Sequence, residues 1–197
     1  MTADPWEPED LLGHVCRVCE KHGLTYLVVG STATIAYGEP RFTNDIDIVV
    51  ELSESQIDSF CTSFPAPEFY LSKPAVLQAV QRRAQFNVIH PASGLKIDFI
   101  VLSDSEFDQS RRHRRRALSV LPEQQAWFAS PEDVILKKMV YFKKGSSDKH
   151  LRDIAGVLRI QKHKLDREYV DKWAAKLNVQ HIWMQIVAAE LDSGDEP

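Results

Sequence analysis

Several features that mark other protein classes are scarce in this sequence. Its 197 residues include only three cysteines, an odd number that argues against a secreted disulfide framework and fits a reducing compartment. No stretch approaches the roughly 18 apolar residues of a membrane span, and the opening MTADPWEPEDLLG carries acids where a signal peptide carries lysines. We therefore expect a cytoplasmic protein with no membrane partner.

An excess of positive charge is also missing. The chain has 24 Lys and Arg against 28 Asp and Glu, a formal net charge of -4. Any contact with nucleic acid would therefore have to come from a local basic patch. With 44% hydrophobic and 26% charged residues the composition is that of an ordinary globular protein, which excludes disordered and collagen-like classes.

Hydrophobic periodicity predicts alternating helices and strands in the first half of the chain. The run TYLVVG is rich in β-branched and aromatic residues and ends at a Gly-Ser turn, while the turn-forming PASG favours a hairpin. The predicted elements, in order, are a helix over 8–22, a strand over 25–30, a short helix closed by Gly38, and strands over 45–52, 84–90 and 95–102.

After residue 103 the strand signals fade and helical periodicity takes over. Ser130 and Pro131, followed by two acids, form a helix N-terminus, and the helix is predicted to continue to about Lys144. Three more segments with helical spacing follow. The sequence thus predicts an α/β lobe over 1–104, with a mixed sheet and flanking helices, and a C-terminal helical lobe over 105–197.

Two carboxylates share one face of the predicted strand 45–52. Side chains two residues apart on a strand point to the same side, so Asp45 and Asp47 lie together while Ile46 and Ile48 face the core. Carboxylates this close repel each other unless a cation or several donors hold both ionised, and oxygen ligands suit Mg²⁺ or Mn²⁺. The alternative is an edge strand whose acids are simply solvated.

Asp98, in LKIDFIVL, is a third candidate carboxylate on a later strand, although a single strand acid also commonly faces water. Gly30 and Ser31 add a possible phosphate site, because a glycine allows close approach to the backbone and the following helix offers free N–H groups. Ser31 could equally serve as a helix cap.

Gly-Ser, a thirteen-residue interval and Asp-Ile-Asp-Ile resemble the signature of the DNA polymerase-β-like minimal nucleotidyltransferase superfamily. The segment PRFTN just before the acids and the third acid on a later strand strengthen the likeness. The resemblance implies that Asp45, Asp47 and Asp98 bind catalytic Mg²⁺ or Mn²⁺. It also implies nucleotide-binding roles for the following residues: Gly30, Ser31, Arg41 and Thr43.

Two later segments, 130–138 and 148–154, resemble the helical half of abortive-infection (AbiEii-like) toxin nucleotidyltransferases. The likeness covers roughly residues 24 to 160 and leaves 178–197 without a counterpart. It implies that four residues line the nucleotide cleft: Lys138, Lys149, Arg152 and Asp153. The alternative is an exposed helix face with local ion pairs.

A dense run of arginines surrounds His113 and predicts contact with the backbone of an RNA acceptor or with a triphosphate. Its members are Arg111, Arg112, Arg114, Arg115 and Arg116. The alternative is a solvated basic segment that pairs with acids of a partner or of the acidic C-terminal tail.

The resemblance implies an enzyme that binds an NTP such as ATP, transfers the NMP to an acceptor and releases pyrophosphate. RNA, a protein hydroxyl and a small molecule are all possible acceptors, because fold and metal site do not specify one. The favoured hypothesis is a toxin-like enzyme that acts on tRNA and is held in check by an antitoxin-like partner protein. The competing hypothesis is a catalytically silent nucleotide-binding or protein-interaction module on the same scaffold.

Overall fold

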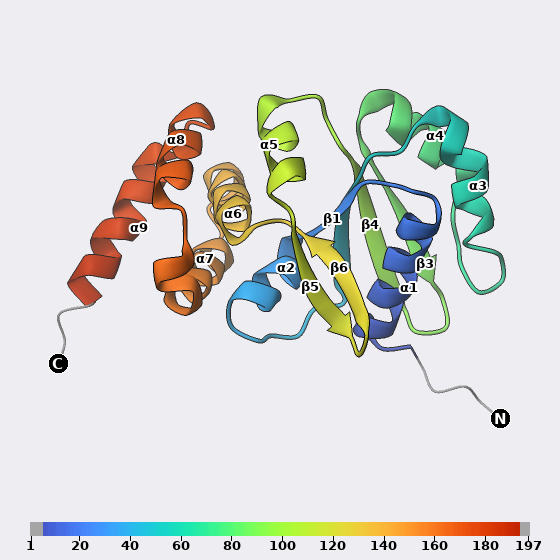
Figure 1. Ribbon diagram of the computed structural model, residues 1–197, viewed down its shortest axis with the longest axis horizontal. Coiled ribbons are helices and arrows are strands. Elements are labelled where there is room, and N and C mark those ends of the chain that lie inside the picture. The colour runs from blue at the N-terminus through green and yellow to red at the C-terminus, as the bar shows by residue number, and fades with distance from the viewer. Residues whose placement is uncertain (1–5, 194–197) are drawn as a thin grey trace. The chain divides into compact units, whose positions relative to one another are not determined.

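The computed structural model describes residues 6–193, and all structural statements below concern those residues. Helices and strands alternate through the first part and helices alone make up the last (Figure 1). The elements are α1 (Pro8–Lys21), β1 (Tyr26–Val29), α2 (Gly30–Tyr37), β2 (Asp45–Val50), η1 (Glu54–Gln56), α3 (Ile57–Thr62), α4 (Lys73–Arg82), β3 (Gln85–His90), β4 (Leu95–Val101), α5 (Glu106–Arg114), β5 (Arg116–Leu121), β6 (Gln124–Phe128), α6 (Pro131–Gly145), α7 (Asp148–Gln161), η2 (Lys162–Lys164), α8 (Arg167–Lys176) and α9 (Gln180–Ser193).

The chain forms two compact units. The sheet unit runs through Thr32 and resumes over Phe42–Ala129, and the helical unit comprises Ala33–Arg41 and the residues from Ser130 onward. This division differs from the predicted one after residue 104, because β5 and β6 return to the sheet. Their sequences, RALSVL and QQAWF, mix polar and apolar residues too irregularly to stand out as strands.

The six strands form one mixed sheet in the order β3-β4-β2-β1-β6-β5. β1 runs antiparallel to β2 and parallel to β6, β2 runs parallel to β4, and the pairs β3/β4 and β5/β6 are antiparallel. The predicted α/β class with a mixed sheet is therefore confirmed. β2, which carries two of the predicted acids, lies in the interior of the sheet rather than at an edge.

Burial explains why these segments become strands. All four residues of β1 are buried, and on β2 the side chains of Ile46 and Ile48 are at most 1% exposed. From α1, apolar residues such as Leu11 and Val15 join the same core. Removing this apolar surface from water stabilises the sheet unit and orients β2 with its acids on the opposite face.

The helical unit has its own apolar core. Ser130 accepts a hydrogen bond from the backbone N–H of Asp133, which confirms the predicted start of α6. Ile135, Leu136 and Met139 on this helix are fully buried. Helices α6 to α9 confirm the predicted C-terminal helical lobe, and within the described residues no helix combines the length and apolarity needed to cross a bilayer.

Candidate functional site

The three predicted acids lie on one face of two neighbouring strands. β2 and β4 pair in parallel with Asp47 directly opposite Asp98 and Asp45 directly opposite Lys96. Because paired residues of adjacent strands point to the same side of a sheet, the three carboxylates share that face. Their exposure differs: the side chain of Asp45 is 65% exposed and that of Asp98 only 11%.

Lys96 is a member of this face that the prediction missed. Its Nζ lies 2.8 Å from Oδ2 of Asp98 and 3.8 Å from Oδ1 of Asp45. The hydrogen bond to Asp98 raises the pKa of the Lys96 amine, so the lysine is charged at neutral pH. The signal was present in LKIDFIVL, where Lys96 stands two residues before Asp98 and so on the same side of the strand.

Gly30 makes room for the second acid. Its φ is +61°, a left-handed conformation that glycine adopts without strain, and it opens α2. A Cβ at this position would lie 1.9 Å from Oδ2 and 2.9 Å from Cβ of Asp47. Any other residue would therefore force the Asp47 carboxylate out of its place.

Thr32 and Thr43 border the start of β2. The hydroxyl of Thr43 donates to the backbone carbonyl of Asp45 at 3.4 Å, and that of Thr32 reaches the same oxygen at 3.5 Å. Thr43, predicted to bind the nucleotide, is thus placed where it supports the strand that carries the acids.

The chemical type of the ligands on this face, carboxylate oxygens, suits a divalent cation. Three carboxylates supply only oxygen ligands, which is what Mg²⁺ and Mn²⁺ prefer, and the absent Cβ of Gly30 leaves room for the Asp47 carboxylate itself. Within the part of the chain that the structure describes, however, no three His, Cys, Asp or Glu side chains are drawn together closely enough to hold an ion. At this face the ammonium of Lys96 lies next to Asp98 and within ion-pair distance of Asp45.

Ser31, also predicted to bind the nucleotide, lies at the start of α2 in the sheet unit. The other predicted nucleotide-binding residues belong to the helical unit, where four of them line one cavity of about 320 Å³. These are Arg41, Lys149, Arg152 and Asp153. The volume is at the low end for ligand pockets, which suits a phosphate group better than a whole nucleotide.

Lys138 and Asp153 form a buried ion pair in the helical unit. Nζ of Lys138 donates to Oδ2 of Asp153 at 2.5 Å, and both residues are less than 10% exposed. Nε of Arg41 contacts the other carboxylate oxygen at 3.2 Å. Burial alone would raise the pKa of Asp153, but the hydrogen bonds and charges of Lys138 and Arg41 lower it overall. Asp153 therefore positions two cations.

Asp153→Asn is expected to lower the free energy of unfolding by about 3 kcal/mol near neutral pH, because the buried Lys138 ammonium loses its carboxylate. A lowered folded-state pKa means that this stabilisation is present above the unfolded pKa of about 4 and is lost as the pH falls through the folded value. Urea denaturation at a series of pH values measures the difference between wild type and variant, which should shrink in acid.

Glu39→Gln is the matched control for that experiment. Glu39 pairs with Arg159, and both side chains are more than half exposed, so breaking the pair should cost less than about 1 kcal/mol. Equal losses for the two variants at neutral pH would contradict a special role for the buried carboxylate.

The predicted arginine patch is divided by the structure. Arg111 is 2% exposed, its Nη1 lies 2.8 Å from Oδ1 of Asp108, and it is not available to an acceptor, which corrects the prediction for this residue. Arg112 pairs with Glu51 at 3.5 Å. The run crosses from α5 into β5, so successive side chains point in different directions instead of forming one surface.

Arg115 differs from its neighbours because its guanidinium lies over the ring of Trp127, 4.6 Å from the centroid. Trp127 is 37% exposed, so the stacked pair reaches solvent at the β5–β6 end of the sheet. Arg114, Arg115 and Arg116 are all partly exposed. Arg112 is partly exposed too, so of the five predicted arginines only Arg111 is buried.

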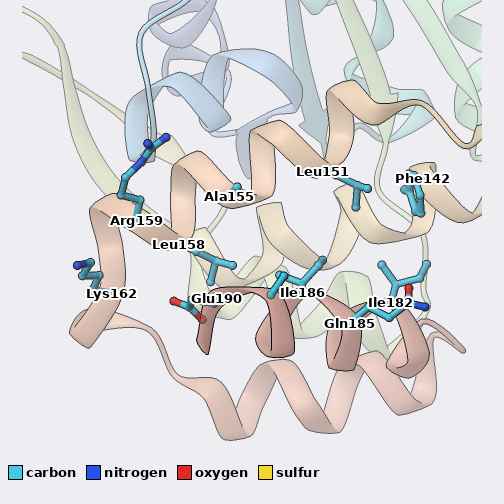
Figure 2. A pocket seen from close by; sticks show the side chains of 11 residues that line it. Phe142, Leu151, Ala155, Leu158, Arg159, Lys162, Ile182, Gln185, Ile186 and Glu190 are labelled. Atoms are coloured by element: carbon cyan, nitrogen blue, oxygen red, sulfur yellow. The ribbon is translucent and has the colours of Figure 1, made fainter. Parts of the chain in front are cut away.

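A larger cavity of about 630 Å³ in the helical unit contains none of the predicted residues. Figure 2 shows apolar side chains along its length and three charged side chains at one end. Two of the charged groups have partners, since Arg159 pairs with Glu39 and Glu190 accepts a hydrogen bond from Arg167 at 2.8 Å. The lining comes from several helices, so no single sequence segment indicated the cavity.

No protein-family model and no curated protein matches this chain. Solved structures do match. The structure of ANT(2'')-Ia in complex with adenylyl-2''-tobramycin superimposes with a TM-score of 0.59 at 12% identity, covering 88% of this chain and 98% of the other. The lincosamide antibiotic adenylyltransferase LnuA with bound lincomycin gives a TM-score of 0.52 at 14% identity, covering 80% and 99%.

At this level of identity the likeness concerns the fold. It confirms that the mixed sheet with flanking helices and a following helical part is the arrangement found in nucleotidyltransferases. The chain therefore has the nucleotidyltransferase fold.

Proposed function

We propose that this protein is a cytoplasmic, metal-dependent nucleotidyltransferase that moves an NMP from an NTP to an acceptor and releases pyrophosphate. The observation that carries the proposal is the placement of Asp45, Asp47 and Asp98 on one face of paired strands, with Gly30 leaving space for Asp47. A catalytically silent module would have no need for three acids on one face of an interior part of the sheet.

In this proposal different residues bind the cation and the phosphates. Asp45 and Asp47, with Asp98 as the third acid, hold the divalent cation. When bound, Mg²⁺ or Mn²⁺ lowers the pKa of an attacking hydroxyl and neutralises charge on the phosphates. Gly30 and Ser31 lie at the N-terminus of α2, where the positive end of the helix dipole favours phosphate oxygens.

A cavity within the helical unit offers cations of its own for phosphate groups. Arg41, Lys149 and Arg152 line its smaller cavity, and Asp153 holds Arg41 in position while it neutralises Lys138. We therefore assign Asp153 a positioning role and the three cavity cations a role in phosphate binding.

Two acceptor classes have specific support. An RNA acceptor, tRNA in the toxin-like hypothesis with an antitoxin-like partner, is supported by the partly exposed Arg114, Arg115 and Arg116 and by the stacked Arg115–Trp127 pair. A small hydroxylated molecule is supported by the fold likeness to structures that contain adenylyl-2''-tobramycin or lincomycin. The burial of Arg111 removes one of the five arginines that support an RNA acceptor.

The function is tested by following labelled phosphate. With Mg²⁺ or Mn²⁺, an NTP labelled at the α-phosphate should transfer its label to an acceptor, tried as total tRNA and as a set of hydroxylated antibiotics. The same NTP labelled at the γ-phosphate should release its label only as pyrophosphate, and a chelator should stop both. Acceptor labelled from the γ-phosphate would show phosphoryl transfer instead, and no transfer from any NTP would reject the proposal.

A further inference from the structure

Lys96 is fixed on the acid face by the register of the sheet. The parallel pairing of β2 and β4 sets Lys96 opposite Asp45 and Asp98 opposite Asp47. Because Leu95 and Ile97 beside it are buried, the strand cannot slip by one residue without exposing its core side chains. The lysine is therefore held among the carboxylates by the fold itself.

The contacts of Lys96 are those of a counter-ion. Its Nζ is 2.8 Å from Asp98 and 3.8 Å from Asp45, and its side chain is 37% exposed, so it can turn away into solvent without unfolding the strand. Three carboxylates on one face carry a formal charge of about -3 when ionised, and one ammonium offsets only part of it. The face remains attractive to a second cation.

We propose that Lys96 is a built-in cation that competes with the divalent ion for Asp45 and Asp98. This inference rests on the proposed function. Without metal, the ammonium limits repulsion among the acids and keeps Asp98 in place. A divalent ion gains these oxygens only when the ammonium leaves them, so its intrinsic affinity is reduced by the work of breaking the existing ion pairs.

The competition has a functional consequence. An ion that arrives already bound to a triphosphate brings additional contacts to the protein, whereas a free ion has only the carboxylates to bind. Lys96 therefore weakens occupancy by free metal and favours loading by the metal–nucleotide complex. It is a positioning residue for the acids and sets the affinity of the site for the cation.

The test measures Mn²⁺ affinity without nucleotide, by electron paramagnetic resonance of the free ion. Lys96→Gln should bind Mn²⁺ about tenfold more tightly than wild type, a factor that corresponds to about 1.4 kcal/mol. Lys96→Arg, which keeps the charge, should bind like wild type. Lys73→Gln is the matched control, because Lys73 pairs with the exposed Asp58 at 2.7 Å elsewhere in the sheet unit.

A second readout is the melting temperature measured in the presence of a chelator. Lys96→Gln should melt at a lower temperature than Lys73→Gln when metal is absent, and added Mn²⁺ should raise its melting temperature more than that of wild type. If wild type binds Mn²⁺ as tightly as Lys96→Gln or more tightly, the inference is overturned, whereas the proposed function is unaffected. No Mn²⁺ binding by wild type or by Lys96→Gln, with or without NTP, would overturn both.

Discussion

Replacing Asp47 with Asn is expected to reduce nucleotidyl transfer by at least about 10²–10³-fold, the loss typical of removing one charged contact that stabilises the transition state. Asp47 lies opposite Asp98 and beside the space left by Gly30, so its carboxylate is central to the acid face. Rates of transfer of α-phosphate label, measured at saturating NTP and metal, give the comparison.

The fold of this variant should be intact. Asn has nearly the shape of Asp, and removing one of several like charges relieves repulsion, so stability without ligand should be unchanged or slightly higher. Asp58→Asn is the control for loss of one negative charge. The Asp58 side chain is 78% exposed and forms an ion pair with Lys73, whose side chain is 60% exposed. If Asp47→Asn folds and its transfer rate equals that of wild type, Asp47 is not a metal ligand in the reaction, and the hypothesis of a catalytically silent module is favoured.

Gly30→Ala is expected to destabilise the protein and to reduce transfer as strongly as Asp47→Asn does. The left-handed backbone alone should cost about 1–2 kcal/mol with any residue that carries a Cβ. The new methyl group would also lie 1.9 Å from Oδ2 and 2.7 Å from Cγ of Asp47, so the carboxylate must move. Activity should therefore fall to the level of Asp47→Asn.

Gly94→Ala separates the two causes. Gly94 has φ +71° in the turn between β3 and β4, and a Cβ there would meet nothing within 4 Å. This control carries the backbone strain without the clash, so it should lose stability but keep its transfer activity. Urea denaturation and the transfer assay on both variants test this, and a Gly30→Ala protein that behaves like Gly94→Ala would show that Asp47 does not depend on the glycine.

The acid face was predictable because its pattern is local. Alternation along 45–52 and 95–102 identifies the side of each strand that carries an acid, and apolar residues on the other side identify the core. β5 and β6 were missed because their evidence is not local. β6 is held by pairing with β1, about a hundred residues earlier, through Val28 and Phe128.

The arginine run shows the opposite error, because its local pattern predicted a larger exposed basic surface than the structure has. Five arginines within six residues suggest one basic patch, but α5 ends at Arg114 and β5 begins at Arg116. The change of element turns the side chains in different directions, and Arg111 is buried against Phe107 with its charge paired to Asp108. Charge density in a sequence does not reveal which members face solvent.

By itself the sequence determined which residues alternate between core and acid face, where Gly30 precedes a helix, and that the later part of the chain is helical. These features follow from periods of two or 3.6 residues and from local turn chemistry. Only the tertiary structure decided that Asp98 lies opposite Asp47, that Lys96 lies between acids of two strands, and that Asp153 holds Arg41 and Lys138. The reason is physical: strand register and buried ion pairs depend on contacts between residues far apart in the chain, and no local period specifies them.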